Sequence, residues 1–309
     1  MIQPAKKIRQ QFADTMLEVG KADQNLVVLI GDISHFVLQP FAQACPGRFY
    51  NIGICEPTIV SMGAGLAKAG LYPVMHTIAP FLIERSFEQI KLDFCYQGMA
   101  GNLVTVGSAF DYSKLGCTHH CYDDWGLMKS LPNTQVVYPA SPMEFDILFR
   151  QTYRNSFLTL FRLPEHGHGY GLEPDSVQFG KALKITDGKD LTVVTTGSHL
   201  GDAMDCRTEL TQMGLDPEIL YVHTIHPLDL ESISASASKT RRVLVMEEHV
   251  RPGGIGDEIL RAIHPLGGIQ LQWLGIPAEF IREYRSHAEH CDALGLNKRG
   301  ILAIAKEFK

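Results

Sequence analysis

Short runs of β-branched and other apolar residues alternate with helical patterns along the whole chain. Four runs lie in the first half and four in the second, at residues 26–30, 103–106, 136–138, 158–161, 191–195, 219–222, 243–246 and 271–274. Strands separated by helices predict βαβ units whose sheets are mostly parallel and flanked by helices. The fold class is therefore α/β, with parallel or mixed sheets.

One amphipathic helix is predicted over residues 80–97. Ile83, Phe87, Ile90 and Phe94 recur at steps of four, three and four, which places them on one helix face. A proline at the start and a glycine just past the end are typical helix boundaries.

A second helix is predicted from Thr58 to Ala69, preceded by a proline and ended by a glycine. Its small residues, among them Gly63 and Gly65, predict that it packs closely against another backbone, since larger side chains would hold it away.

The periodic pattern breaks between Pro164 and Gly180, where proline, glycine, histidine and acidic residues replace apolar ones. A chain of 309 residues with 45% apolar content can build two domains. We therefore predict α/β domains at residues 1–165 and 181–309, with a linker over residues 166–180.

Composition excludes several classes of protein. A formal net charge of -6 gives no electrostatic footprint for nucleic acid, and no apolar run has the length of a membrane span. The basic N-terminal residues have no apolar stretch behind them, so they do not form a secretory signal. Seven scattered cysteines fit free thiols in a reducing compartment. We expect a cytoplasmic protein.

Glu56 is the first candidate for chemistry. It lies in the segment Asn51-Ile52-Gly53-Ile54-Cys55-Glu56-Pro57, between a strand and a helix of small residues. A carboxylate at a helix N-terminus is stabilised by the helix dipole, which is reason enough for a glutamate there. The functional alternative is a buried glutamate that hydrogen-bonds a ligand nitrogen, with Phe81 as an aromatic wall.

The segment Cys117-Thr118-His119-His120-Cys121 has the ligand types of a zinc site. Neighbouring residues in one pentapeptide do not close a tetrahedron, so no metal ligand is assigned to this chain. Two histidines on a loop after a strand instead favour hydrogen bonding to a substrate oxygen or proton transfer, with solvated loop histidines as the alternative.

Two further patterns adjoin strands. Glu247-Glu248-His249 follows one, and the glycines from Gly253 to Gly256 precede a helix, where they either bind a phosphate or, as we favour, pack tightly. Arg162 directly follows the apolar run at residues 158–161 and is the best-placed cation for a substrate anion, although most arginines at strand ends are solvated or paired.

Taken in order, these segments resemble the C-terminal half of a transketolase, a thiamine diphosphate enzyme. The resemblance covers nearly the whole chain and rests on Gly31-Asp32-Ile33, Gly53-Ile54-Cys55-Glu56, residues 81–90, Gly116-Cys117-Thr118-His119-His120, Leu131-Pro132-Asn133, His226-Pro227-Leu228-Asp229, Glu247-Glu248-His249 and residues 253–256. It implies a pyrimidine-binding domain followed by a transketolase C-terminal domain.

The resemblance also implies roles around the cofactor. Glu56 matches the glutamate that hydrogen-bonds the aminopyrimidine and so promotes formation of the thiazolium ylide. Phe81 matches the aromatic residue that stacks on the pyrimidine, with Leu82 one position away as a substitute. Ile33 matches the apolar residue that holds the cofactor bent, and Asp32 lies beside it.

Other positions carry over to the cofactor motif and the substrate. Arg85 belongs to the cofactor-binding helix motif. His119 matches the active-site histidine that faces the substrate, with His120 beside it. Arg162 matches the arginine that grips the distal phosphate or other anion of the sugar.

Two departures from the family pattern matter. Leu115 occupies the position where transketolases carry an acidic residue that reads a sugar hydroxyl, which leaves the acceptor open. The chain also lacks the Gly-Asp-Gly and Asn segment that holds Mg²⁺ and the diphosphate. The resemblance therefore implies a split enzyme, inactive alone, whose partner subunit supplies the diphosphate domain and most of the contacts to thiamine diphosphate and Mg²⁺.

The implied assembly is an α2β2 heterotetramer that transfers a two-carbon ketol unit from a ketose phosphate, or another anionic ketose, to an aldose. The alternatives are the β subunit of a 2-oxo acid dehydrogenase, which lacks the Thr-His-His loop, and a non-catalytic relative. A 1-deoxyxylulose-phosphate synthase is a weaker option, because those enzymes carry all domains on one chain. Pentose, sulfosugar and branched-sugar metabolism are not distinguished.

Overall fold

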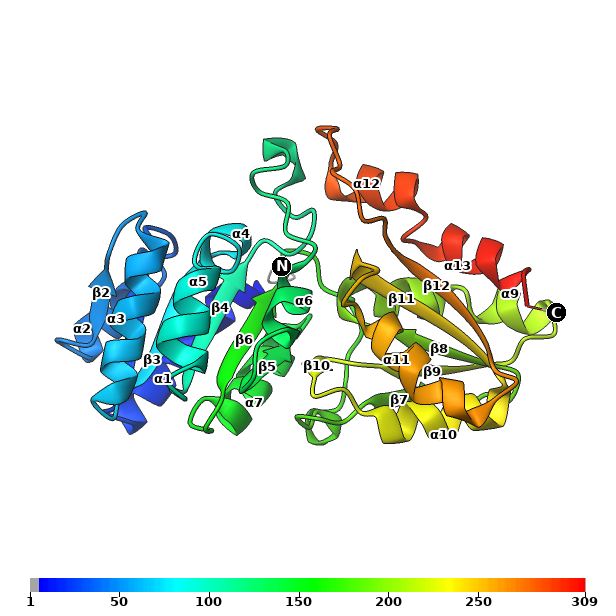
Figure 1. Cartoon of the computed structure of the whole chain (residues 1–309), viewed down its shortest axis with the longest axis horizontal. Helices are drawn as coiled ribbons and strands as arrows, with labels where there is room; N and C mark the ends of the chain where they lie inside the picture. Colours follow the sequence, from blue (N-terminus) through cyan, green and yellow to red (C-terminus); the bar gives the residue numbers. More distant parts are fainter. Residues whose placement is uncertain (1–5, 309) are drawn as a thin grey trace, which may run out of the picture.

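The computed structural model describes residues 6–308, which form two sheets side by side, each covered by helices on both faces (Figure 1). The first sheet has strand order β10-β5-β6-β4-β3-β1-β2. Its strands are β1 (Leu26–Ile30), β2 (Phe49–Asn51), β3 (Tyr72–Ile78), β4 (Gly101–Val106), β5 (Thr134–Val137), β6 (Leu158–Leu163) and β10 (Thr224–His226). All pairs are parallel except β10 with β5.

The second sheet has strand order β12-β11-β8-β9-β7, with only the edge strand β7 antiparallel. Its strands are β7 (Leu183–Thr186), β8 (Leu191–Thr195), β9 (Pro217–Tyr221), β11 (Arg242–Val250) and β12 (Gln270–Ile276). All eight predicted strands are confirmed, and the predicted α/β class with mostly parallel sheets is confirmed with them.

Alternating strand side chains divide the core of the first sheet into two layers. In β1, Leu26, Val28 and Ile30 face one layer while Val27 and Leu29 face the other. One face is covered by α1 (Ile8–Ala22), α2 (Gln39–Ala44) and α7 (Pro142–Thr152). The opposite face is covered by α3 (Glu56–Lys68), α4 (Ala79–Leu82), η1 (Ile90–Cys95) and α6 (Asp124–Lys129), with the short α5 (Phe87–Gln89) before η1.

The second sheet is covered in the same way. Helices α8 (Leu200–Asp205), α9 (Arg207–Gln212) and α13 (Lys298–Ala305) pack on one face, and α10 (Leu230–Thr240) and α11 (Ile255–Ile263) on the other. Helix α12 (His287–Leu294) precedes α13. Single turns η2 (Ser113–Leu115), η3 (Pro174–Ser176), η4 (Gly197–His199) and η5 (His264–Leu266) complete the elements. No helix in residues 6–308 is long and apolar enough to cross a membrane.

The predicted helix over residues 80–97 is broken into α4, α5 and the π-helical η1. The predicted face is nevertheless correct, because Ile83, Ile90 and Phe94 are buried and Phe87 is half-buried. The predicted second helix begins at Glu56, two residues earlier than expected. Glu56 is therefore the first residue of α3 rather than part of the preceding loop.

Candidate active site

The predicted site residues follow neighbouring strands of the first sheet at their carboxyl ends. Asp32 follows β1, Glu56 follows β2, Phe81 follows β3 and His119 lies on the loop after β4. These four strands are adjacent in the order β4-β3-β1-β2, and the chain reverses direction along the sheet at β1. Such a reversal opens a crevice at the carboxyl edge, where ligands of α/β sheets bind.

Asn51 fixes the loop that leads to Glu56. Its side-chain oxygen accepts hydrogen bonds from the backbone N–H groups of Asp32 and Gly53, each at 3.1 Å. Its amide nitrogen donates to the Asp32 carboxylate at 3.1 Å. Gly53 has a φ of 79°, a conformation that favours glycine, and the turn delivers Glu56 to the start of α3. The loops after β1 and β2 are thus tied together.

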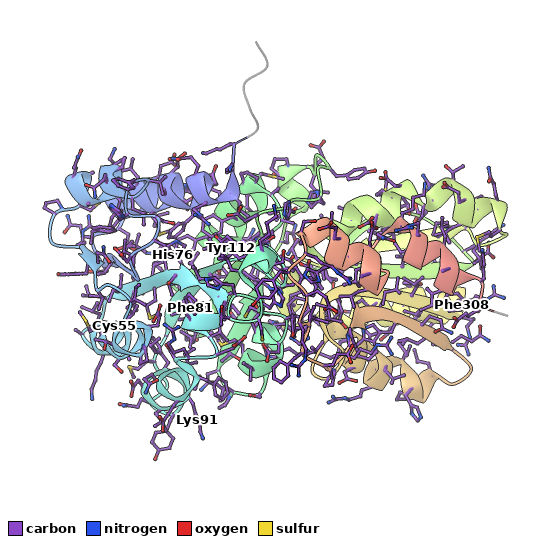
Figure 2. The ribbon with its side chains drawn as sticks, turned by 90° about the horizontal axis from the view of Figure 1, so that it is seen from above. Cys55, His76, Phe81, Lys91, Tyr112 and Phe308 are labelled. Carbon is purple, nitrogen blue, oxygen red and sulfur yellow. The ribbon has the colours of Figure 1, made fainter. Side chains whose placement is uncertain are left out.

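The Glu56 carboxylate is buried and paired with a side chain that is half exposed. Glu56 is 1% exposed, and Arg85 Nη1 donates to its Oε2 at 2.7 Å while the Arg85 side chain is 44% exposed. The Arg85 guanidinium also lies 4.3 Å from the centroid of the Phe81 ring. Arg85 therefore contacts both Glu56 and Phe81. Figure 2 shows where Phe81 lies in the first domain.

The contacts of Arg85 with Glu56 and Phe81 indicate whether an aminopyrimidine ring fits the site. The guanidinium is planar, stacks on an aromatic ring and donates N–H groups to a buried carboxylate. A flat heterocycle with a protonated ring nitrogen would make the same contacts, a stack on Phe81 and a hydrogen bond to Glu56. The residues present fit the pyrimidine end of thiamine diphosphate, provided that Arg85 moves aside.

Phe81 and Leu82 are clearly separated in space. Leu82 is fully buried in the core under the first sheet, whereas the half-buried Phe81 ring faces Arg85 and His119. The Phe81 and His119 ring centroids are 5.1 Å apart. Of the two neighbours, only Phe81 is available to a ligand beside Glu56.

The two loop histidines point to different places. His119 is half-buried, with its Nδ1 3.0 Å from the Thr118 hydroxyl, and burial lowers its pKa. His120 lies in the interior, where its ring packs against Phe110 and His290 at centroid distances of 5.3 and 5.5 Å. The structure brings His119 to Phe81 and turns His120 away from it.

Ile33 and Asp32 lie on the loop after β1. Asp32 has a φ of 57°, a left-handed conformation that is uncommon outside glycine and concentrates at functional loops. Ile33 packs partly against the core. Ser34 Oγ is 2.8 Å from Nε2 of the buried His76 on β3, which ties this loop to the strand that leads to Phe81.

Arg162 differs from the prediction. Its side chain is fully buried within β6 and its Nε lies 2.9 Å from the Asp124 carboxylate, which is also fully buried. The guanidinium is 4.7 Å from the ring centroids of both Trp125 and Tyr138. Burial raises the pKa of Asp124 to about 6 although Arg162 opposes the shift. The predicted cation therefore holds α6 against the sheet, and it is not brought to the surface beside His119.

The glycine turn before α11 holds no external anion, because Glu247 fills that role. Its carboxylate accepts from the backbone N–H groups of Ile255 at 2.7 Å and Gly256 at 3.1 Å. A side chain added at Gly254 would meet the same carboxylate at 2.5 Å. Of the two interpretations, the structure confirms tight packing.

Four polar residues near His119 were not predicted from the sequence. Tyr112 lies 6.4 Å from His119 between ring centroids, and its hydroxyl group hydrogen-bonds Arg9 and Glu165. Asp111 accepts from the backbone of Glu165 at 2.9 Å, and burial raises its pKa to about 6. They come from three separate segments without a motif, so only the tertiary structure shows their proximity.

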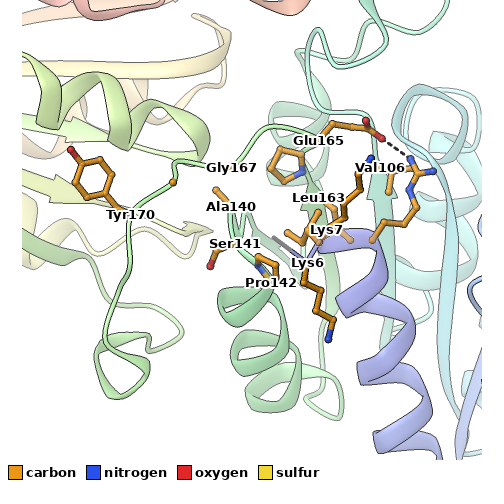
Figure 3. A pocket seen from close by; sticks show the side chains of 14 residues that line it. Lys6, Lys7, Val106, Ala140, Ser141, Pro142, Leu163, Glu165, Gly167 and Tyr170 are labelled. Atoms are coloured by element: carbon orange, nitrogen blue, oxygen red, sulfur yellow. Dashed lines mark hydrogen bonds and ion pairs between the residues drawn. The ribbon is translucent and has the colours of Figure 1, made fainter. Parts of the chain in front are cut away.

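Two recesses adjoin these residues. One, of about 450 Å³, is lined by the η2 loop, His166 and the start of α12. The other, of about 430 Å³, lies between α1 and the loop after β6, where Arg9 pairs with Glu165 (Figure 3). Neither recess is lined by Glu56 or Phe81.

Two family models match the chain. The pyrimidine binding domain of transketolase matches residues 5–167, and the transketolase C-terminal domain matches residues 180–301. The chain is 30% identical over 303 residues to a subunit of the apulose-4-phosphate transketolase of Phocaeicola vulgatus, a match that covers 97% of this chain and 96% of that one. This protein belongs to the transketolase family.

Longer and shorter relatives show which part of a transketolase it is. It is 30% identical to a 1-deoxy-D-xylulose-5-phosphate synthase of Halothermothrix orenii, covering 88% of this chain but 43% of that protein. The structure of a split gene transketolase, an inactive beta4 tetramer, matches with a TM-score of 0.88 and 26% identity over 97% of both chains. The chain is the C-terminal subunit of a two-chain transketolase, as the sequence predicted, and the dehydrogenase alternative is not favoured.

Proposed function

We propose that this chain provides the pyrimidine half of a thiamine diphosphate site and transfers a two-carbon ketol unit from a ketose to an aldose. The observation that carries the proposal is the buried Glu56 carboxylate beside the Phe81 ring, with His119 in contact with that ring. When bound, thiamine diphosphate supplies the carbanion chemistry of the reaction.

The residues of this chain would bind and orient the cofactor and the substrate. Glu56 would share a proton with a ring nitrogen of the aminopyrimidine in a hydrogen bond, and burial of the carboxyl group protects that bond from competing water. Phe81 stacks on the same ring, Ile33 supports it from the β1 loop, and Asp32 fixes that loop through Asn51. His119, whose ring contacts the Phe81 ring, would move a proton at a substrate oxygen.

A second subunit completes the site in this proposal. Large apolar side chains are exposed on the loops after β1 and β2, where Phe36 is 80% exposed and Ile54 is 69% exposed. Exposed apolar side chains that gather on a surface are typical of interaction sites. We assign them to the subunit that carries the diphosphate-binding domain and Mg²⁺, in an α2β2 enzyme of the cytoplasm. The inactive beta4 tetramer of the related split enzyme supports the need for that subunit.

The proposed donor substrate is a ketose. The burial of Arg162 bears on which residue binds the end of the ketose that is remote from the reacting carbons. Arg162 is buried, Arg85 lies over the Phe81 ring that His119 contacts, and Arg9 is paired with Glu165. We therefore keep ketose phosphates and other anionic ketoses as the class to screen, together with uncharged ketoses as controls.

The proposal is tested with Glu56→Gln in the assembled enzyme. The nearly isosteric change keeps the fold but removes the charged acceptor, so we expect ketol transfer to fall by at least 100-fold on the scale of general acid–base groups. Calorimetry with thiamine diphosphate and Mg²⁺ is run on this chain alone and with a diphosphate-domain subunit. Normal turnover by the variant, or binding in neither sample, would contradict the assignment.

A matched pair of surface variants tests the partner surface. Ile54→Asp places a charge on the assigned surface, whereas Phe280→Asp places one at an equally exposed residue of the second domain. We expect only Ile54→Asp to prevent co-purification with the diphosphate-domain subunit. Equal behaviour of the two variants would move the surface elsewhere.

A further inference from the structure

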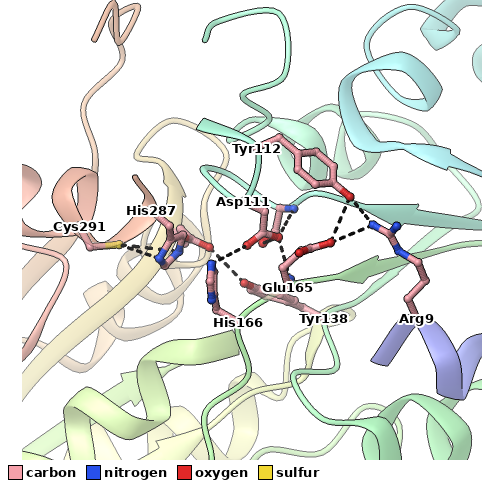
Figure 4. Close-up of polar contacts among 10 residues, drawn as sticks. Arg9, Asp111, Tyr112, Tyr138, Glu165, His166, His287 and Cys291 are labelled. Carbon is pink, nitrogen blue, oxygen red and sulfur yellow. Dashed lines mark hydrogen bonds and ion pairs between the residues drawn. The ribbon is translucent and has the colours of Figure 1, made fainter. Parts of the chain in front are cut away.

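A cluster of three metal-ligating side chains lies where the two domains meet, outside the proposed thiamine site. Glu248 comes from β11. His287 and Cys291 come from α12 (Figure 4). One ligand atom from each of the three lies within 4.8 Å of the others. Carboxylate oxygen, imidazole nitrogen and thiolate sulfur are all ligands of zinc.

Local structure fixes the two helix residues. His287 and Cys291 are four residues apart, so they lie on the same face of α12. Ser286 and Glu289 form a reciprocal capping box that sets where the helix begins, and with it the direction of His287. Cys291 Sγ lies 3.8 Å from both ring nitrogens of His287.

Glu248 is held in place before any ion binds. It is buried in the second sheet, where its Oε1 lies 2.7 Å from His287 Nε2 and its Oε2 accepts from the Tyr138 hydroxyl at 3.2 Å. The Tyr138 contact comes from the other domain and orients the carboxylate toward α12. Metal ligands are typically supported by such a second hydrogen bond.

We propose that Glu248, His287 and Cys291 bind one divalent metal ion of the zinc class. With bond lengths of about 2.0–2.3 Å, tetrahedral ligand atoms lie roughly 3.3–3.8 Å apart. The Cys291–His287 distance of 3.8 Å meets this spacing, and the Glu248–His287 contact of 2.7 Å opens by less than about 1 Å. Ionised Glu248 and Cys291 with neutral His287 carry two negative charges, which a divalent ion neutralises.

Of the three ligands, His287 also lines the recess of about 450 Å³. The same recess is lined by Asp111 and His166, whose ring centroid is 4.5 Å from that of His287. A site with three protein ligands and one open position admits water or a small oxygen ligand. The ion would also join α12 to β11 of the second sheet.

The test uses the full chain, purified without a histidine tag, freed of metal by a chelator and then dialysed against Zn²⁺ or Co²⁺. We expect about one equivalent of Zn²⁺ per chain by elemental analysis. The Co²⁺ form should show a near-ultraviolet thiolate-to-cobalt band and intense visible bands of tetrahedral cobalt. Cys291→Ser should remove the thiolate band, and His287→Ala should weaken binding by at least tenfold.

Two matched variants serve as controls. His290→Gln changes a histidine one position before Cys291, and Cys206→Ser changes another buried cysteine of the same domain. Both should retain the metal and the cobalt spectrum, and circular dichroism checks that all variants are folded. Absence of stoichiometric metal in the unaltered chain, a cobalt complex without the thiolate band, or equal binding by Cys291→Ser and Cys206→Ser would overturn the proposal.

Discussion

At the residue scale, Arg162 and Asp124 form a buried ion pair in which each charge stabilises the other. Both side chains are fully buried, and Arg162 lies between the Trp125 and Tyr138 rings. Removing one member leaves an uncompensated charge, so we expect Arg162→Ala to lower the free energy of unfolding by about 3–5 kcal/mol. Urea denaturation measures the loss.

Replacing both partners separates a structural role from substrate binding. Apolar residues in place of the whole pair remove the buried charges, so the Arg162→Leu, Asp124→Leu double variant should recover most of the lost stability. In the assembled enzyme its KM for an anionic ketose should then equal that of the unaltered enzyme. A KM raised at least tenfold for anionic ketoses alone would restore Arg162 to the substrate site.

Arg85 and Phe81 are expected to respond oppositely to substitution. Phe81→Ala removes an aromatic stack of about 0.5–1.5 kcal/mol, so thiamine diphosphate should bind up to about tenfold more weakly in the assembled enzyme. Arg85→Ala removes a guanidinium that lies where the pyrimidine would bind, and the cofactor affinity should not fall. Calorimetry on both variants decides. Weaker binding by Arg85→Ala would make Arg85 a direct cofactor contact instead.

The structure brings together those predicted site residues that follow a strand. Glu56 and Phe81 lie shortly after β2 and β3, and His119 lies on the long loop after β4, because parallel strands bring their carboxyl ends to one edge. Arg162 lies within β6, where burial depends on which elements cover the strand and is not encoded locally. His120 differs from His119 only by one step along a loop, and no periodicity states which of the two turns inward.

At the element scale, α3 packs against β3 through Gly63. A side chain added at Gly63 would meet Met75 Sδ at 2.4 Å, whereas nothing lies within 4 Å of one added at Gly65. We expect Gly65→Ala to stabilise the chain by roughly 0.5–1 kcal/mol, as alanine does in helices. Gly63→Ala should gain less or destabilise, because Met75 must move. Thermal unfolding of the two variants compares them, and equal shifts would contradict this packing.

Hydrophobic pattern and element type were predictable to different degrees. The sequence indicated the small-residue contact of α3, but the partner at Gly63 is the Met75 side chain rather than backbone. Periodicity identified the buried face over residues 80–97 because it reports which side chains face the core. It does not report backbone hydrogen bonding, so the division into α4, α5 and η1 was not predicted.

At the scale of the whole molecule, the two domains share structure across their boundary. Strand β10 follows the second domain's β9 but pairs with β5 of the first sheet. The His249 and Trp125 rings stack at 4.4 Å, and the Gly126 N–H group donates to His249 at 3.1 Å. The pairing of β10 with β5 joins residues that are far apart in sequence, and local sequence patterns do not reveal such a pairing.

Buried neutral histidines make the fold sensitive to acid. His76 is fully buried in the first sheet, and burial lowers its pKa to about 3. In the unfolded chain its pKa is about 6.5, so between pH 6.5 and 3 the unfolded state binds more protons than the folded state. Stability from this residue is therefore complete above pH 6.5 and falls with decreasing pH, by up to about 1.4 kcal/mol per pH unit.

Other titrating groups change the free energy of unfolding with pH in the opposite direction. The prediction therefore compares the pH dependence of the unaltered chain with that of a His76 variant. The pKa values of Asp111 and Asp124 are raised to about 6, so these carboxyls favour the folded state at low pH and lose that effect as the pH rises toward 6. His76→Asn removes the titrating ring together with its contact to Ser34, and it keeps an amide donor for the Val104 carbonyl. In urea denaturation at pH 6.5, 5.5 and 4.5, the unaltered chain should lose more stability per pH unit than the variant. Parallel curves would mean that His76 is protonated in the folded protein.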